Sequence, residues 1–403
     1  MENFRIVDVC PVCDGRSSQM VWELPRYPFT EQRTNALPQM GTNQTVADQS
    51  VLWCPSCTHV YLRKQHNPEL LYNDDYQTVA SKSMAAVQAT GRLLSFAQRA
   101  IDFSGVELVF DIGANDGSFL GQVRASGFRG QLAALDPSFS NWDEGIIGFT
   151  SFIEDFDFSS LPPSGKTVYF ASHVVEHIAD PRGFFSLLSQ EMSVDDYLVV
   201  QFPALEPIVR DLRFDQIHHQ HFHYFSWKSV LTVLDHAQLE VVSSGLDWFH
   251  YGAGNLVLRK KRLQSNEKIR LLPWGQSALA EYAFLTDDRL LRAINTYRTY
   301  QLTVGEVLSA GPYVALGAGL MSPIIFYHLT ETWANCKAIY DGEVSKYGTQ
   351  YIGTPRPISP IPESLEGEVV LISGSVSKSA GRALGKIAMS KSAESLVYPV
   401  LNF

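Results

Sequence analysis

The 403-residue chain lacks any run of about 20 uninterrupted apolar residues, so the sequence predicts no membrane-spanning helix. Its start, MENFRIVDVC, has no basic segment followed by an apolar run, which is the pattern of a secretory signal. From these absences we expect a cytoplasmic protein that does not act at a membrane.

Basic residues are fewer than acidic ones: the chain has 32 Lys and Arg and 42 Asp and Glu, which gives a formal net charge of -10. A surface of this sign repels phosphate backbones, so we expect no nucleic-acid partner. Charged residues make up only 18% of the chain and apolar residues 45%, which excludes a disordered or fibrous protein. At roughly 150 residues per domain, the length predicts two or three folded domains.

Cysteine is also scarce, but four of the five cysteines form two C-P-x-C pairs. In a reducing compartment such pairs indicate a bound metal rather than disulfides. Two thiolates from each tight turn suit tetrahedral zinc, and four sulfur ligands leave no open position, so the ion is structural. We therefore predict one Zn²⁺ bound by Cys10, Cys13, Cys54 and Cys57. The alternatives are unrelated thiols, a redox pair, or a zinc ribbon that binds nucleic acid, and the acidic balance disfavours the last.

The order of apolar segments predicts an α/β fold. We expect a helix from Ser83 to Phe103, and then strands that alternate with helices, as in a doubly wound sheet, up to about residue 260. A linker and a helical stretch from Ala278 to Leu308 follow.

Near the C-terminus, VALGAGLMSP repeats the pattern of strand, Gly turn and helix. It is weak evidence for a nucleotide or sugar-nucleotide site, because a turn that needs Gly for packing looks the same. We expect three domains: a small zinc-binding domain over 1–75, a central domain over 76–265 and a C-terminal Rossmann-like domain over 266–403.

The clearest ligand motif is DIGANDG, directly after the strand VELVF. A Gly-bearing turn at the carboxyl end of a strand lets a ligand approach the backbone. The spacing is not G-x-G-x-x-G, which argues against NAD, while an acidic turn suits the cationic methionine moiety of S-adenosylmethionine. Asp136 ends the next strand, where a ribose-binding carboxylate is expected. The alternative is a purely structural connection between strand and helix, in which Gly forms the turn and Asp caps the helix. The predicted cofactor contacts are Asp111, Gly113, Asn115, Asp116, Gly117 and Asp136, with Ser172 at the end of a later strand.

Two His-containing segments complete the candidate site. His173, Glu176 and His177 follow the strand TVYFA and are expected to face the cleft, although a Glu-His pair there could simply orient a loop. The segment FDQIHHQHFHYFSW holds four of the eleven histidines, at positions 218, 219, 221 and 223. Metal binding is one interpretation, but no thiolate lies nearby and general acid or base catalysis suits imidazole better. For at least two of the four, a purely polar role in a loop is expected.

Taken in order, these features resemble the nucleotide-sugar 3-C-methyltransferases of deoxysugar biosynthesis, and the resemblance covers nearly the whole chain. It rests on the two C-x-x-C pairs, DIGANDGSFL, VVEHIAD, FDQIHHQHFHYFS and the second Rossmann-like domain. It implies a zinc-binding N-terminal domain, a central class I Rossmann-like methyltransferase domain that binds S-adenosylmethionine, and a C-terminal Rossmann-like domain that helps to enclose the substrate.

The resemblance also implies a reaction, the methylation of a nucleotide-linked 4-keto sugar at the carbon next to the ketone. A histidine of the family's Y-H-E-H stretch removes a proton, and the enolate attacks the methyl group of the sulfonium. His221 matches this base, His177 matches the supporting histidine, and Tyr76 matches the N-terminal tyrosine that closes over the substrate.

The chain departs from the family where substrate is expected. Y-H-E-H reads His218, His219, Gln220, His221, so an amide replaces the carboxylate next to the base, and the C-terminal GAGLMSP lacks the family's Lys. We therefore count His218 and Gln220 among the candidate catalytic residues and expect that the acceptor can differ.

We expect an S-adenosylmethionine-dependent C-methyltransferase with a structural Zn²⁺ and a small nucleotide sugar as its partner, and a monomer is the working assumption. The alternatives are an O- or N-methyltransferase on a related sugar or small metabolite, and a non-methylating sugar-nucleotide or NAD-binding protein. The retained cofactor turn argues against the last.

Overall fold

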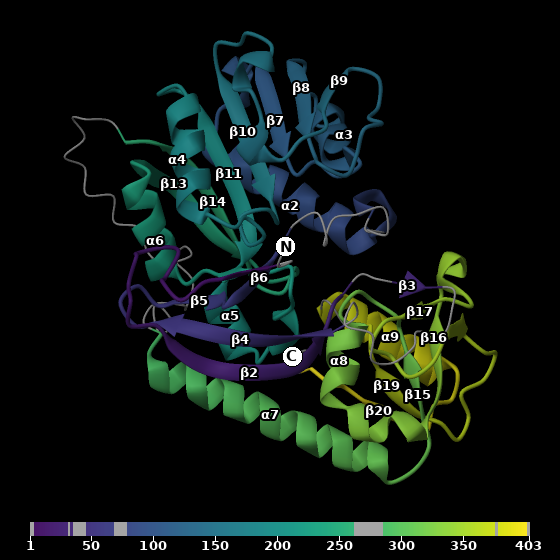
Figure 1. Ribbon diagram of the computed structural model, residues 1–403. Coiled ribbons are helices and arrows are strands. Elements are labelled where there is room, and N and C mark those ends of the chain that lie inside the picture. Colours follow the sequence, from purple (N-terminus) through teal and green to yellow (C-terminus); the bar gives the residue numbers. More distant parts are fainter. Residues whose placement is uncertain are drawn as a thin grey trace.

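The computed structural model describes residues 4–30, 33–34, 46–67, 79–261, 285–374 and 378–400. Within these ranges the chain forms three larger sheets with helices packed on them, which confirms the predicted α/β class (Figure 1). No helix among the described residues is both long and apolar enough to cross a membrane.

The N-terminal sheet is antiparallel, with the strand order β12-β5-β4-β2. Its strands are β2 (Gln19–Pro28), β4 (Val46–Cys54), β5 (His59–Leu62) and β12 (His223–Tyr224). Two small pairs accompany it: β1 (Phe4–Ile6) with β6 (Lys64–His66), and β3 (Arg33–Thr34) with β17 (Gln350–Tyr351). Because β12 belongs to the His-rich segment, this sheet fixes that segment in space.

The central sheet has seven strands in the order β13-β14-β11-β10-β7-β8-β9. They are β7 (Leu108–Ile112), β8 (Gln131–Leu135), β9 (Ile146–Phe149), β10 (Thr167–Ser172), β11 (Tyr197–Pro203), β13 (Leu239–Asp247) and β14 (Ala253–Lys260). Strands β9, β8, β7, β10 and β11 are parallel, whereas β14 and β13 are antiparallel to their neighbours. The inner strands are continuous apolar runs because helices bury both of their faces.

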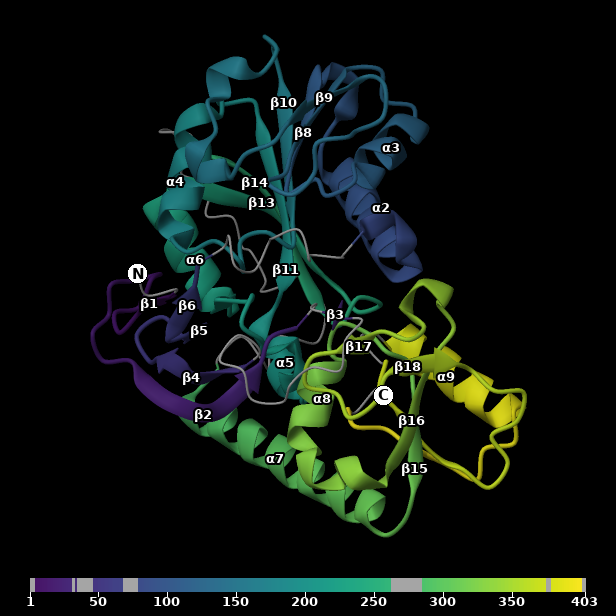
Figure 2. The ribbon, with the colours of Figure 1, turned by 45° about the vertical axis from the view of Figure 1, so that its right-hand side comes forward.

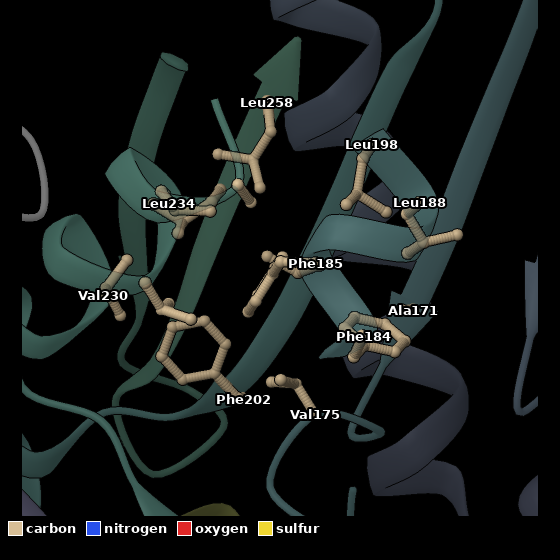
Figure 3. Close-up of a cluster of buried hydrophobic side chains, with 14 of the residues drawn as sticks. Ala171, Val175, Phe184, Phe185, Leu188, Leu198, Phe202, Val230, Leu234 and Leu258 are labelled. Carbon is tan, nitrogen blue, oxygen red and sulfur yellow. The ribbon is translucent and has the colours of Figure 1, made fainter. Parts of the chain in front are cut away.

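Helices cover the two faces of the central sheet (Figure 2). On one face lie α2 (Met84–Ala100) and α3 (Ser118–Ala125); on the other lie α4 (Pro181–Glu191) and α6 (Trp227–His236). Figure 3 shows the second layer, where Phe185 of α4 and Leu234 of α6 gather with Leu198 of the sheet. The start of α4 is fixed by the Asp180 side chain, which accepts a hydrogen bond from the Gly183 N–H.

A parallel five-stranded sheet, in the order β18-β16-β15-β19-β20, closes the chain. Its strands are β15 (Tyr313–Leu316), β16 (Cys336–Asp341), β18 (Ile358–Pro360), β19 (Val369–Ile372) and β20 (Ser395–Val397). The remaining α-helices are α5 (Leu205–Arg210), α7 (Asp287–Ser309), α8 (Ser322–His328) and α9 (Lys378–Ser390). Short 3₁₀ helices are η1 (Ala80–Lys82), η2 (Phe103–Gly105), η3 (Ile153–Asp155), η4 (Phe158–Ser160), η5 (Phe214–Gln216), η7 (Thr330–Asn335) and η8 (Val344–Lys346).

The long helix α7 connects the N-terminal sheet to the C-terminal one. At its first turn, Asp287 Oδ1 accepts a hydrogen bond of 2.5 Å from Trp53 Nε1. At mid-helix, Tyr297 packs edge-on against Trp22, with 6.0 Å between ring centroids. Further along, Gln301 Nε2 donates to the Pro399 carbonyl at 2.6 Å. The helix predicted to end at residue 308 is thus present, and residues 278–284 of that stretch lie outside the described residues.

Candidate active site and metal-binding clusters

The four paired cysteines meet at one point. Sγ atoms are 3.6 Å apart for Cys10 and Cys57 and 3.5 Å apart for Cys13 and Cys54, and all four thiols are free. The four sulfurs lie within 4.8 Å of one another. A Cβ on Gly15 would stand only 3.1 Å from Cys13 Sγ, so the backbone wraps the cluster closely. This all-sulfur set fits a structural Zn²⁺.

The turn after β7 has the backbone shape that a glycine motif predicts. Gly113 and Gly117 have φ values of 72° and 75°, and Asn115 has a φ of 49°, all in the left-handed region. A Cβ at Gly113 would stand 2.6 Å from Val174, and one at Gly117 would stand 2.8 Å from Trp142. Only glycine fits at these two positions without a shift of a neighbour.

The side chains of Asn115 and Asp116 turn toward the protein. Asn115 Oδ1 accepts a hydrogen bond of 2.9 Å from the Ala80 N–H, and Asp116 Oδ2 accepts one of 3.0 Å from the Ser81 N–H. Both predicted cofactor contacts therefore hold η1, the first described element after residue 78, against the turn. The Asn115 carbonyl also has a partner within the protein, because it accepts a hydrogen bond of 3.1 Å from Trp142 Nε1.

A pocket opens at the carboxyl ends of β7, β8 and β10. Its lining includes Gly113, Asn115, Asp136, Glu154 and His177. Asp136 Oδ2 accepts from the Asn115 N–H at 2.9 Å and Asp136 Oδ1 from the Ser138 N–H at 2.8 Å, so the carboxylate is fixed in orientation. Burial raises the pKa of Asp136, although these backbone donors oppose the rise. Burial also raises the pKa of Asp111, and the Asp136 carboxylate raises it further.

Glu154 was not among the sequence-based candidates, although it lines the same pocket. It lies in η3 after β9, with few sequence signals besides an acidic residue in a short turn. Burial raises the pKa of the Glu154 carboxyl. Ser172, in contrast, was predicted to contact the cofactor, but its Oγ donates to Gln201 Oε1 at 3.1 Å, and Gln201 Nε2 donates to Asn255 Oδ1 at 2.7 Å. Ser172 thus belongs to a polar chain across the sheet and is absent from the pocket lining.

His173 and Glu176 form a pair beside the pocket. His173 has a left-handed backbone, with a φ of 56°, and its Nδ1 lies 2.8 Å from Glu176 Oε1. The Tyr251 hydroxyl lies 3.2 Å from His173 Nε2. Strained backbone at a non-glycine residue is common at functional sites. The sequence predicts that both residues face the cleft, and His173 lies in the pocket lining.

His177, His218 and His221 form a contiguous group of imidazoles. The ring centroids of His177 and His221 are 4.8 Å apart, and those of His218 and His221 are 3.9 Å apart. His177 Nδ1 donates to the Gln220 carbonyl at 2.9 Å. Burial lowers the pKa of all three rings, and neighbouring imidazoles lower the pKa of His218 and His221 further. Because His177 lines the pocket, this group borders the predicted cofactor site.

The other two histidines of the segment, His219 and His223, make contacts that hold it against neighbouring parts of the protein. His219 Nε2 donates to the Tyr27 carbonyl at 2.9 Å, and its ring stacks on Phe29. His223 Nε2 donates to the Ile178 carbonyl at 2.9 Å, while its Nδ1 lies 3.1 Å from His59 Nε2. These contacts agree with the expectation that two of the four have a purely polar role.

Gln220 takes part in the site through its backbone rather than its side chain. Its Oε1 accepts a hydrogen bond of 3.0 Å from the Thr30 hydroxyl, whereas its carbonyl accepts from His177. Tyr76, the other predicted catalytic residue outside the imidazole group, lies outside the described residues.

The Gly turn of the C-terminal domain is filled by the protein itself. A Cβ on Gly317 would stand 2.7 Å from the Gly374 Cα, so two backbones meet there. Asp341, at the end of the neighbouring strand, accepts from the Ala318 N–H at 2.8 Å and pairs with Lys346 at 3.5 Å. The packing interpretation of this glycine therefore has direct support in the described residues.

The comparisons with known proteins concern mainly the part of the chain that forms the central sheet. A family described as "Methyltransferase domain" matches residues 88–244. The C-methyltransferase NovU of Streptomyces niveus is 26% identical over 247 residues. That match covers 59% of this chain and 57% of NovU, so the chain spans a little over half the length of this relative.

Solved structures that match part of this chain include the mitomycin 7-O-methyltransferase MmcR, human N-acetylserotonin methyltransferase and the plantazolicin methyltransferase BpumL. MmcR is 19% identical with a TM-score of 0.33, over 45% of this chain and 57% of that chain. The human enzyme is 15% identical with a TM-score of 0.33, over 44% and 55% of the two chains. BpumL is 12% identical with a TM-score of 0.35, over 44% and 85%. Each similarity covers less than half of this chain.

Proposed function

We propose that the chain is an S-adenosylmethionine-dependent C-methyltransferase that acts on a nucleotide-linked keto sugar, starting from the match of residues 88–244 to a methyltransferase domain. The resemblance to nucleotide-sugar C-methyltransferases and the match to a C-methyltransferase support the class of reaction. The choice of a nucleotide-linked keto sugar as the methyl acceptor rests on the family resemblance of the sequence.

The observation that carries the proposal is the continuity between the pocket and the imidazole group. His177 lines the pocket that holds Asp136 and Glu154, and its ring contacts His221 on the other side. A methyl donor in this pocket would stand beside side chains able to accept a proton, as methylation of a carbon acid requires.

In the pocket, we propose that the Gly113 to Gly117 turn lies against the cofactor and that Asp136 accepts hydrogen bonds from the ribose hydroxyls. Each carboxylate oxygen of Asp136 already accepts one backbone N–H and keeps further lone pairs for a ligand. Glu154 adds a second carboxylate acceptor to the pocket lining. When bound, S-adenosylmethionine supplies the electrophilic methyl group.

For the proton, the resemblance assigns the base to His221 with His177 in support. His218 contacts His221 with the two rings tilted by 43°, and the Nδ1 atoms of both rings are buried without a hydrogen-bond partner. Either ring is therefore placed to accept a proton from the acceptor carbon. We propose that Tyr76 closes over the substrate, as in the family, and that Gln220 contributes by orienting His177.

Mass spectrometry of ligands retained by the purified protein tests the cofactor, and S-adenosylhomocysteine or S-adenosylmethionine is the expected result. Incubation with a nucleotide-linked 4-keto sugar in heavy water tests the carbon acid, because C-methylation requires exchange next to the ketone. Retained NAD would contradict the cofactor. Methylation without any solvent exchange at that carbon would favour transfer to oxygen or nitrogen.

A further inference from the structure

Three side chains that can donate electron pairs to a metal converge beside the pocket. One ligand atom from each of Glu176, His177 and His221 lies within 4.8 Å of the others. Glu176 is fully buried, and its Oε2 has no hydrogen-bond partner; His221 Nδ1 is likewise buried and unpartnered. Leaving a buried carboxylate oxygen and an imidazole nitrogen without partners is costly, and a bound cation would satisfy both.

The surroundings of the three groups orient them toward this common point. His173 occupies the other carboxylate oxygen of Glu176, at 2.8 Å. His177 Nδ1 is engaged by the Gln220 carbonyl, which directs Nε2 to the opposite side of the ring. Such outer contacts, a backbone carbonyl on a histidine and a hydrogen bond on a carboxylate, are what fix ligands in known metal sites.

We propose that Glu176, His177 and His221 bind one divalent first-row transition metal ion. Two imidazoles and one carboxylate form a mixed nitrogen and oxygen set that leaves coordination positions open. This set differs from the all-sulfur cysteine cluster, in which four sulfur ligands would leave no coordination position of the ion open. The chain would then hold two metals of different roles, a structural one on sulfur and a reactive one beside the pocket.

The role of the second metal rests on the proposed methyl transfer to a carbon acid. An open position on the ion takes the ketone oxygen of the acceptor, and the ion draws electron density from the neighbouring C–H bond. That bond breaks, its proton goes to His218 Nδ1, and its electron pair forms the enolate. The enolate carbon then bonds to the methyl group, the S–C bond breaks, and the sulfur leaves as a neutral thioether. In this arrangement His221 is a ligand, and His218, whose ring centroid lies 3.9 Å from that of His221, is the base.

The test uses Mn²⁺ as the probe, because nitrogen and oxygen ligands suit it while the cysteine cluster prefers softer ions. Full-length protein is dialysed against a chelator, its zinc content is recorded, and MnCl₂ is titrated by calorimetry without cofactor or acceptor. We expect one Mn²⁺ per chain. Glu176→Gln and His221→Ala should each abolish this binding, and His173→Ala should weaken it by about 10- to 100-fold through Glu176.

Glu191→Gln and His236→Ala are matched controls, since both residues are exposed and lie outside the cluster, on α4 and α6. Both should bind Mn²⁺ as the wild type does, and circular dichroism confirms that each variant is folded. Folded wild-type protein that binds no Mn²⁺ overturns the site, as does equal binding by the ligand variants.

The failure of the proposed function gives a different result. If Mn²⁺ binds as expected but no methyl transfer occurs with any keto sugar, the metal site stands and the reaction is wrong. If chelated protein that binds no Mn²⁺ transfers methyl groups at the full rate, the reaction stands and the metal site is overturned. With the site intact, Mn²⁺ should raise the rate of chelated protein, and His218→Ala should lose activity while it keeps the ion.

Discussion

Replacing Asp136 is the sharpest test of the pocket as a cofactor site. The side chain is 8% exposed, and both of its oxygens are held by backbone N–H groups, so it needs no rearrangement to accept the two ribose hydroxyls. Two hydrogen bonds to a carboxylate contribute about 1.5 to 3 kcal/mol in total, after their exchange with water. Asp136→Ala should therefore raise the dissociation constant of S-adenosylmethionine by roughly 10- to 150-fold.

Isothermal titration calorimetry measures this change, with Asp143→Ala as the control because Asp143 is exposed after the same strand. The control should bind as the wild type does. Asp136→Asn keeps one acceptor oxygen and should fall between the two. An unchanged dissociation constant in Asp136→Ala, with an unchanged melting temperature, would refute the placement of the ribose.

The same carboxyl predicts a pH dependence. Because burial raises the pKa of Asp136, the group takes up a proton at a higher pH than an exposed aspartate does. The carboxylate form is needed to accept both hydroxyl protons, so affinity should be full above this raised pKa and fall as the pH drops through it. Affinity that is constant across the acid range in the wild type would contradict this role.

Three further perturbations test the framework around the pocket. Cys54→Ser should release zinc and lower the melting temperature, and unchanged zinc content in metal analysis would contradict the four-sulfur site. Asp215→Ala should cost about 3 to 5 kcal/mol in denaturant unfolding, because it removes the carboxylate that makes two hydrogen bonds of 2.8 Å to the buried Arg213 guanidinium; a loss below 1 kcal/mol would contradict that pairing. Gly113→Ala should weaken cofactor binding and cost roughly 1 to 2 kcal/mol from its left-handed backbone, and wild-type values for both would contradict the close packing of the turn.

Local sequence patterns predicted those parts whose structure is set by nearby residues. The helix expected from Ser83 is α2, capped by the Ser83 side chain, which accepts from the Ala86 N–H. The glycines of DIGANDG supply the left-handed backbone of the turn, and a Cβ at either position would meet a neighbouring side chain. The cysteine pairs come together because each is a tight turn beside a strand of one sheet.

Contacts between distant segments could not be read from the sequence. His223 pairs with Tyr61 in a strand register that no local pattern contains, and this pairing holds the His-rich segment against the N-terminal sheet. The side chains of Asn115 and Asp116 accept hydrogen bonds from backbone N–H groups of η1, and no local pattern in the sequence places η1 beside this turn. Glu154 reached the pocket through a loop after the edge strand β9, without a motif of its own.

The measurement that tests the central claim most directly is the position of the transferred methyl group. The purified protein would be incubated with isotope-labelled S-adenosylmethionine and a nucleotide-linked 4-keto sugar, and the product examined by nuclear magnetic resonance. C-methyl transfer predicts a labelled methyl carbon bonded to the sugar carbon next to the ketone. A labelled methyl carbon bonded to oxygen or nitrogen, formed by protein that retains its cofactor, would contradict the account.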